Sequence, residues 1–423
     1  MLYTSGQFLI VSFCVRPLQE LPCLNETLEG SMLSLSQKSK RKKRQYFGEG
    51  LDTESTPQEL IQQWSPPHKQ QMVCKGKENE ENVFVLARRP RKRREVNGLS
   101  WDNLPDELLL GILAHLPLQD LLRMSRVCKR WHRLALDESL WQSVDLVGKA
   151  QLDQALGQVL TAGVLGLRCP RTCLGEPRFT HTRPLRVQHM DLSSCIVATP
   201  VIEDILSRCR LLENISLEGL ELSDRILQSL SQNTGLVRLN LCGCSGFSPD
   251  SLGEMLKSCT RLGELNLSWC DFGADHVKAA VGNFPPSITQ LNLSGYRQNL
   301  TMEDLTDLAE RCPNLVNLDL SDSVLITTSS FPILQQLKSL RHLALSRCYQ
   351  FHPAALADFE KFPELQTLEV YGLVQDTDLP ILCKALPHLQ INTRPFSGVA
   401  RPTEAALRNR TMWGMACRLV FRP

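Results

Sequence analysis

The clearest pattern along the chain is a spacing of apolar residues, apolar-x-x-apolar-x-apolar, that recurs through its second half. The first clear copy starts at Val187 and the last at Leu386, and successive starts are separated by 25, 24, 26, 26, 27, 25, 25 and 21 residues. Weaker copies start at Trp141 and Val164. Each copy predicts a short strand, a turn and a returning helix, and neighbouring copies must stack to bury their apolar residues. An α/β solenoid is therefore the predicted architecture.

Polar residues fill the strand positions between the repeated apolar ones. A period of about 20–29 residues is typical of leucine-rich repeats, in which these positions face outward on the concave side. The predicted strip contains Asn240, Asn266, Asn292, Asp319 and Glu369, followed by Ser268, Ser294, Ser321 and Ser346. Just beyond it lie Trp269, Arg297, Asp322 and Arg347. One Trp and two Arg on a polar strip favour a protein-binding surface, and an ordinary solvated face is the alternative.

The stretch before the repeats has apolar residues at helical spacing in three successive segments. They run from Leu108 to Leu116, from Leu118 to Met124 and from Val127 to Trp141. Pro105 suits the first turn of the first helix, and Pro117 ends that helix. Since about 40 residues cannot bury a sufficient core alone, the surplus apolar residues predict a partner surface or a packed neighbour. A plain helical hairpin that caps the next domain is the alternative.

Charge is distributed unevenly along the 423 residues. The formal net charge is +2, but residues 1–97 carry +5 and residues 98–423 carry −3. The near-neutral total argues against a protein that coats nucleic acid. The first 97 residues have no sustained helical or strand period, so we predict that they are disordered. Ser65 precedes a proline in this segment and is a candidate phosphorylation site.

Two basic runs, Lys38–Arg44 and Arg88–Arg94, each place six positive charges in seven residues. Like charges repel, so such a run stays extended and suits the acidic groove of an import receptor. We interpret both runs as nuclear import signals and expect the protein in the nucleus and cytoplasm. A solvated spacer and nucleic-acid contact are the alternatives. The residues assigned to import are Lys40, Arg41, Lys42, Lys43, Arg44, Arg91, Lys92, Arg93 and Arg94.

The sequence offers little catalytic or metal chemistry. Its 16 cysteines form no C-x-x-C pair, and eight recur at fixed repeat positions, which predicts small buried side chains in a reducing compartment. Cys169, Cys173, His181 and His189 match no common zinc-site spacing. The sequence contains no phosphate-binding loop, and no apolar window reaches the roughly 18 residues of a membrane span. We expect no metal, no cofactor, no membrane contact and no enzymatic activity.

Three motifs in the helical stretch carry a family resemblance. They are LPDEL at residues 104–108, LPLQDLL at residues 116–122 and VCKRW at residues 127–131. Their order and spacing resemble an F-box, and an F-box before cysteine-containing repeats resembles the F-box leucine-rich-repeat family. The resemblance implies a three-helix F-box, a curved leucine-rich-repeat solenoid and a C-terminal tail that packs on the repeats. The domains expected are a disordered basic region at 1–97, the F-box at 98–145, the repeats at 146–395 and the tail at 396–423.

The resemblance also implies a function, that of the substrate-recognition subunit of an SCF (cullin–RING) ubiquitin ligase. The F-box would dock on the Skp adaptor and through it reach the cullin and RING subunits. The matching adaptor-binding positions are Leu104, Pro105, Leu108, Ile112, Leu116, Pro117 and Trp131. Such a subunit holds a substrate close to the transfer machinery and performs no chemistry itself.

A partner site is implied on the concave face of the later repeats, together with the tail. A small Cks accessory protein and a phosphorylated inhibitor of cyclin-dependent kinases would bind there, in the cell cycle at the G1/S transition, and lead to proteasomal degradation of the inhibitor. The matching positions are Trp269, Arg297, Asp322, Arg347 and Trp413. An F-box ligase with a different substrate set, or a repeat protein that binds or inhibits partners outside ubiquitin transfer, is the alternative.

Overall fold

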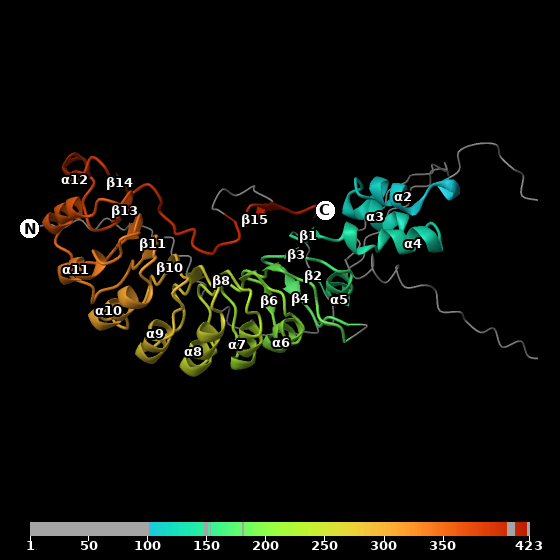
Figure 1. The fold of residues 1–423 in the computed structure, drawn as a ribbon, viewed down its shortest axis with the longest axis horizontal. Coiled ribbons are helices and arrows are strands. Elements are labelled where there is room, and N and C mark those ends of the chain that lie inside the picture. The colour runs from blue at the N-terminus through green and yellow to red at the C-terminus, as the bar shows by residue number, and fades with distance from the viewer. Residues whose placement is uncertain (1–100, 148–150, 153, 180–181, 404–410, 421–423) are drawn as a thin grey trace, which may run out of the picture. The chain divides into compact units, whose positions relative to one another are not determined.

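The computed structural model describes residues 101–147, 151–152, 154–179, 182–403 and 411–420 (Figure 1). The predictions for residues 1–97 concern residues outside this described part, namely their disorder, the two basic runs and Ser65. They stay predictions.

The main element is a parallel sheet of 12 strands, to which each repeat contributes one short strand. The repeat strands are β1 (Ser143–Asp145), β3 (Gly166–Arg168), β5 (His189–Asp191), β7 (Asn214–Ser216), β8 (Arg238–Asn240), β9 (Glu264–Asn266), β10 (Gln290–Asn292), β11 (Asn317–Asp319), β12 (His342–Ala344), β13 (Thr367–Glu369) and β14 (Gln390–Ile391). Their central apolar residues stack in register, as Leu239, Leu265 and Leu291 do, and these three are fully buried. The predicted repeat is thereby confirmed, and the weaker copies at Trp141 and Val164 are repeats too.

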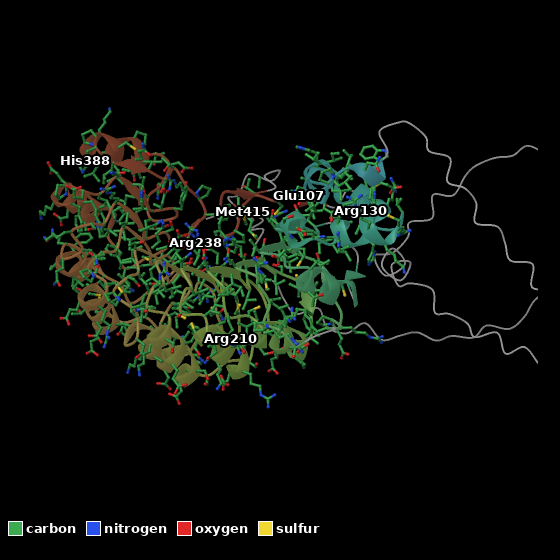
Figure 2. The ribbon with its side chains drawn as sticks, turned by 45° about the vertical axis from the view of Figure 1, so that its right-hand side comes forward. Glu107, Arg130, Arg210, Arg238, His388 and Met415 are labelled. Atoms are coloured by element: carbon green, nitrogen blue, oxygen red, sulfur yellow. The ribbon has the colours of Figure 1, made fainter. Side chains whose placement is uncertain are left out.

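Helices cover one side of this sheet, so the repeats form a curved solenoid (Figure 1). They are α5 (Gln154–Thr161), α6 (Thr199–Ser207), α7 (Asp224–Ser231), α8 (Pro249–Ser258), α9 (Ala274–Val281) and α10 (Met302–Arg311), followed by η3 (Thr328–Ser330), α11 (Phe331–Leu334), η4 (Pro353–Lys361) and α12 (Leu379–Ala385), where η marks a 3-10 helix. A packed helix needs about 10 Å and a strand about 4.8 Å, so helices on one side impose curvature. In Figure 2, Arg210 lies on the helical side and Arg238 on the strand side.

Local sequence fixes where these helices begin. At the start of α10, the Thr301 hydroxyl accepts a hydrogen bond from the Asp304 N–H at 3.2 Å, and the Asp304 carboxylate accepts one from the Thr301 N–H at 2.8 Å. This reciprocal cap satisfies two of the N–H groups that the first turn of a helix leaves without intrahelical partners. Leu305 and Leu308 then face the sheet and are fully buried.

Before the repeats lie three short helices, α2 (Asp106–Leu113), α3 (Leu118–Met124) and α4 (Lys129–Ala135), with the 3-10 turns η1 (Trp101–Asn103) and η2 (Glu138–Leu140) on either side. Pro105 and Pro117 directly precede α2 and α3. The third predicted segment is longer than its helix, because the chain turns after Ala135. Trp141 is buried there, and its indole N–H donates to the Ala135 carbonyl at 2.9 Å. The helical segment therefore leads directly into β1.

After β14 the chain returns along the concave side of the sheet. Residues 393–403, here called the strap, cross the central strands, and a hairpin of β15 (Thr411–Met412) and β16 (Met415–Ala416) follows. The last described strand, β17 (Leu419–Val420), pairs in parallel with β1 and completes the 12-stranded sheet. The sequence predicts a tail packed on the repeats but not this added strand.

The recurring cysteines are packing residues. Seven of the eight repeat-position cysteines are buried, and Cys383 in α12 is exposed. Burial raises the pKa of the thiols of Cys209, Cys270 and Cys348 to about 12, so they do not form the reactive thiolate. In the described part of the chain, no group of three His, Cys, Asp or Glu side chains could hold a metal ion, and no helix has the length and apolar character to cross a bilayer.

Candidate functional site

The first candidate surface is the outer side of α2. Leu108 and Ile112, one helical turn apart, are 57% and 43% exposed, whereas Leu109 and Leu113 on the inner side lie in the core. The helix α2 has apolar residues on two sides, and only one of these sides is buried in the core. We define the docking face as the exposed residues Pro105, Leu108, Ile112 and Pro117.

The other three predicted adaptor residues lie behind this face. Leu104, Leu116 and Trp131 are half-buried and pack against the core. The Trp131 ring meets the Trp101 ring edge-on, with 5.9 Å between centroids. Trp101 and Val127 are both exposed and were not among the predicted site residues. Val127 begins the VCKRW motif and Trp101 lies three residues before the LPDEL motif, so both join the candidates for the same surface.

The polar strip faces the concave side as predicted, where Asn266 and Glu369 contact the strap, but it is buried, so the solvent exposure expected from the sequence is wrong. The side-chain oxygens of Asn240, Asn266 and Asn292 each accept a hydrogen bond from the backbone N–H two residues later, and none of these residues is more than 3% exposed. Asp319 makes the same contact with Ser321 at 3.0 Å. The repeated acceptor closes the turn after each strand. These side chains stabilise the turn backbone. The side chain at the next position of each turn is the one available to a partner.

Three predicted partner-binding residues occupy that next position in different repeats. Trp269, Asp322 and Arg347 have backbone φ angles of 57°, 63° and 59°, and Gly243 and Gly372 take the same left-handed position in other repeats. A residue with a side chain costs about 1–2 kcal/mol in this conformation. Strained backbone of this kind concentrates at functional sites. We call Trp269, Asp322 and Arg347 the turn row.

Asp322 and Arg347 contact each other directly within the turn row. The Nε and Nη2 atoms of Arg347 donate to the two Asp322 carboxylate oxygens at 2.7 and 2.5 Å. This pairing raises the pKa of Arg347, whose side chain is still 46% exposed. Arg297 lies beside them, because its N–H donates to the Asp322 carbonyl at 3.1 Å, and its side chain is exposed. The ion pair fixes the orientation of the Arg347 guanidinium, which can still donate hydrogen bonds to a second anionic group.

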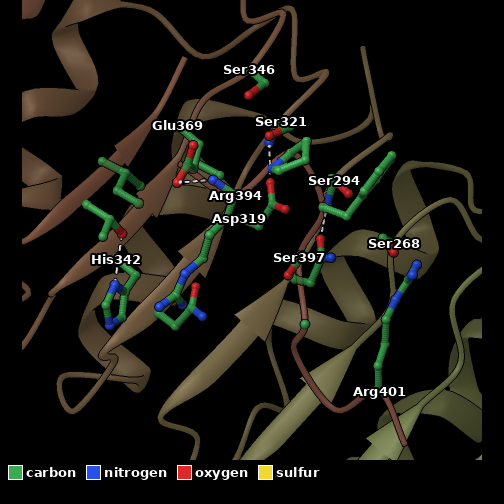
Figure 3. Close-up of a pocket in the computed structure, with 18 of the residues that line it drawn as sticks. Ser268, Ser294, Asp319, Ser321, His342, Ser346, Glu369, Arg394, Ser397 and Arg401 are labelled. Carbon is green, nitrogen blue, oxygen red and sulfur yellow. Dashed lines mark hydrogen bonds between the residues drawn. The ribbon is translucent and has the colours of Figure 1, made fainter. Parts of the chain in front are cut away.

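A cavity of about 150 Å³ opens beside the turn row, between the strands and the strap (Figure 3). Trp269 and Arg347 line it. Its strand side also includes Asp319, His342 and Glu369, and its strap side includes Arg394, Phe396 and Arg401. The strap residues were not predicted as site residues, since a segment without periodicity gives no sign of which surface it crosses.

The cavity is acidic on its strand side. Burial raises the pKa values of Asp319 and Glu369, which are both 7% exposed. One Glu369 oxygen accepts hydrogen bonds from the Thr393 hydroxyl and the Arg394 N–H, each at 3.1 Å. The other oxygen is buried without a hydrogen-bond partner among the described residues. An anionic group of a partner therefore fits at the exposed Arg347 rather than deep in the cavity.

Trp413, the fifth predicted partner residue, lies against the strap. Its backbone N–H donates to the Pro402 carbonyl at 2.7 Å, and its indole N–H donates to the Ala400 carbonyl at 3.2 Å. Ala400 is fully buried, and its N–H donates to the Glu264 carboxylate at 3.3 Å. Trp413 thus holds the strap on the concave face, whereas the other four residues come together around the turn row.

Replacing Glu369 with Gln should stabilise the protein at neutral pH. Gln keeps an oxygen for the Thr393 and Arg394 donors and removes the buried charge, so we expect the free energy of unfolding to rise by about 1 kcal/mol. The pKa of Glu369 is raised in the folded state. The wild-type chain therefore loses stability as the pH rises between the unfolded and folded pKa values, and the gain from Gln disappears below that interval. Urea unfolding of wild type and variant near pH 4 and near pH 7 measures the gain in stability at each pH. Equal gains at the two pH values would contradict the burial argument.

Comparisons with known proteins match both parts of the chain. The family model described as F-box-like matches residues 101–147, and the model described as SKP2 LRR domain matches residues 154–420. The chain is 26% identical over 338 residues to human F-box/LRR-repeat protein 12, covering 69% of this chain and 95% of that protein. It is 24% identical over 251 residues to the Arabidopsis thaliana F-box protein SKIP19, covering 59% and 70%. It is 27% identical over 285 residues to the rice (Oryza sativa) Coronatine-insensitive protein homolog 1a, covering 65% and 45%.

Proposed function

The chain belongs to the F-box leucine-rich-repeat family, with repeats of the SKP2 type, and on that premise we propose that it is the substrate-recognition subunit of an SCF ubiquitin ligase. The observation that carries the proposal is that one chain has two separate open surfaces. The docking face lies on α2, and the turn row with its cavity lies on the repeats. The F-box implies binding to the Skp adaptor, which brings the cullin and RING subunits.

The mechanism follows from positioning. Proteins of this family are typically non-catalytic adaptors, so the bond to ubiquitin is made elsewhere in the complex. A solenoid that holds a substrate close to the charged conjugating enzyme raises the effective concentration of its lysines. A continuous core from α2 to the last repeat suits that role, because it limits the motion of one surface relative to the other.

The finer part of the proposal concerns the substrate. We propose that the turn row receives a phosphorylated inhibitor of cyclin-dependent kinases together with a Cks accessory protein, at the G1/S transition. The exposed guanidinium of Arg347 and the nearby Arg297 support this, because an Arg fork pairs with two oxygens of a phosphate or carboxylate. Trp269 adds a large exposed aromatic side chain of the kind that dominates protein interfaces.

Reconstitution tests this proposal. The full chain, assembled with adaptor, cullin, RING subunit and Cks protein, should transfer ubiquitin to the phosphorylated inhibitor at least about tenfold faster than to the unphosphorylated one, since a charge-assisted hydrogen bond contributes about 1.5–3 kcal/mol. Equal rates on both forms would contradict phosphate recognition. Ubiquitin transfer to other substrates but not to the inhibitor would support the ligase role and refute the kinase-inhibitor assignment.

A further inference from the structure

The C-terminal tail contacts the central repeat strands at one end and the helical segment before the repeats at the other. Within the strap, the Val399 carbonyl accepts a hydrogen bond from the Asn266 side chain at 3.2 Å. At the far end, Leu419 in β17 lies opposite Val144 in β1 and is fully buried. The strand covers what would otherwise be the open first edge of the sheet. The tail is therefore held at two widely separated places on the same sheet.

Arg418 links this last strand to two points of the helical segment. Its Nη2 donates to the Ala114 carbonyl at 2.8 Å, and its Nη1 donates to the Ser139 carbonyl at 2.9 Å. Its backbone N–H donates to the Ser143 hydroxyl at 2.9 Å. Ala114 directly follows α2, where helix carbonyls lack intrahelical partners and a cation is favoured. The guanidinium thus joins the end of α2 to the η2 turn, and the backbone N–H of the same residue contacts the first strand edge.

The rest of the tail packs closely enough to hold Arg418 in place. The Met415 methyl lies so near Gly166 in β3 that an added Cβ would come within 2.9 Å of it. Met412 in the same hairpin is fully buried. The planar Arg fork then reaches two fixed carbonyls with little freedom of its own.

We propose that Arg418 is a positioning residue that sets the orientation of α2, and with it the docking face, relative to the repeat solenoid. This rests on the proposed ligase function, in which the two surfaces must keep a fixed separation while ubiquitin is transferred. Residues 114–142 lie between α2 and β1 along the chain. Leu109 and Leu113 of α2 lie in the same apolar core as the repeats, and Arg418 adds two hydrogen bonds across that interval that restrain rotation of α2. Displacements of about 1 Å reduce the rate of a positioned reaction strongly.

The test compares Arg418→Ala with Arg210→Ala in the full chain bound to its adaptor. Arg210 is a matched control, because its Nη1 also donates to two backbone carbonyls, those of Ser207 and Cys209, but both belong to its own repeat. Fluorophores on the exposed Lys129 in α4 and Lys257 in α8 report the distance between the F-box and the solenoid. We expect Arg418→Ala to broaden this distance distribution, to lower ubiquitin transfer about tenfold and to spread it over more substrate lysines.

Adaptor affinity and capture of the phosphorylated inhibitor should stay within about twofold of wild type in both variants, which separates positioning from folding. Arg418→Lys, which keeps a donor but loses the fork, should restore part of the narrow distribution. If Arg418→Ala and Arg210→Ala give the same distribution and the same modified lysines, the positioning role is overturned. Failure of the proposed function would show differently, as a wild-type chain that does not bind adaptor or transfer ubiquitin.

Discussion

Replacing Leu108 and Ile112 with Glu together should abolish binding of the Skp adaptor and leave the fold intact. The two residues are 57% and 43% exposed, so two carboxylates in their place remain hydrated in the free chain. Against an apolar partner surface both charges would lose water without gaining a partner, which costs several kcal/mol. We expect adaptor affinity to fall by about 1,000-fold or more, since each 1.4 kcal/mol corresponds to about tenfold. Calorimetric titration of the full chain with adaptor measures it.

Ile381→Glu is the matched control for this double variant. Ile381 is 66% exposed in α12, so one carboxylate is added to an exposed apolar position in the last repeats, away from the docking face. Its adaptor affinity should equal that of wild type, and urea unfolding of both variants should stay within about 0.5 kcal/mol of wild type. Adaptor binding by the double variant as tight as that of Ile381→Glu would place the docking face elsewhere on the chain.

Much of the fold could be predicted from the sequence, because stacking imposes one requirement on every repeat. A leucine that stacks on the equivalent leucine of the next repeat must recur at a regular interval along the sequence. The pairing of Leu239, Leu265 and Leu291 follows directly from that interval. The strand at Leu419–Val420 leaves no such trace. It forms because β1 offers an unpaired edge and the returning chain reaches it, and two residues are too few to show a pattern.

The candidate site was predictable only in part, for a related reason. Asp322 and Arg347 are one repeat apart, at 25 residues, so the period itself places them side by side. The left-handed turn that both share depends on backbone geometry, and Gly at the same position in other repeats is its only sequence sign. The burial of Glu369 depends on the strap above it, whose place on the concave face has no local sequence signal.

Replacing Arg347 with Gly should weaken capture of the phosphorylated partner by roughly 30-fold or more, because an Arg at the centre of an interface contributes about 2 kcal/mol or more. Stability should hardly change. Gly suits the backbone at φ 59°, as Gly372 does one repeat later, and this relief offsets the lost surface ion pair with Asp322. Fluorescence anisotropy with a labelled phosphopeptide of the inhibitor and Cks protein measures affinity, and urea unfolding measures stability.

Arg225→Ala provides the comparison, since Arg225 in α7 is 82% exposed and forms an ion pair at 3.7 Å with Glu203 in α6, away from the turn row. It should keep wild-type affinity for the phosphopeptide. The phosphopeptide affinity of Asp322→Asn should lie between those of Arg347→Gly and Arg225→Ala, because Arg347 keeps its charge but loses the bidentate contact that orients it. Affinity that is unchanged in Arg347→Gly would move the anionic contact to Arg297 or to the strap. Affinity lost equally in Arg225→Ala would mean that net positive charge, rather than the turn row, attracts the partner.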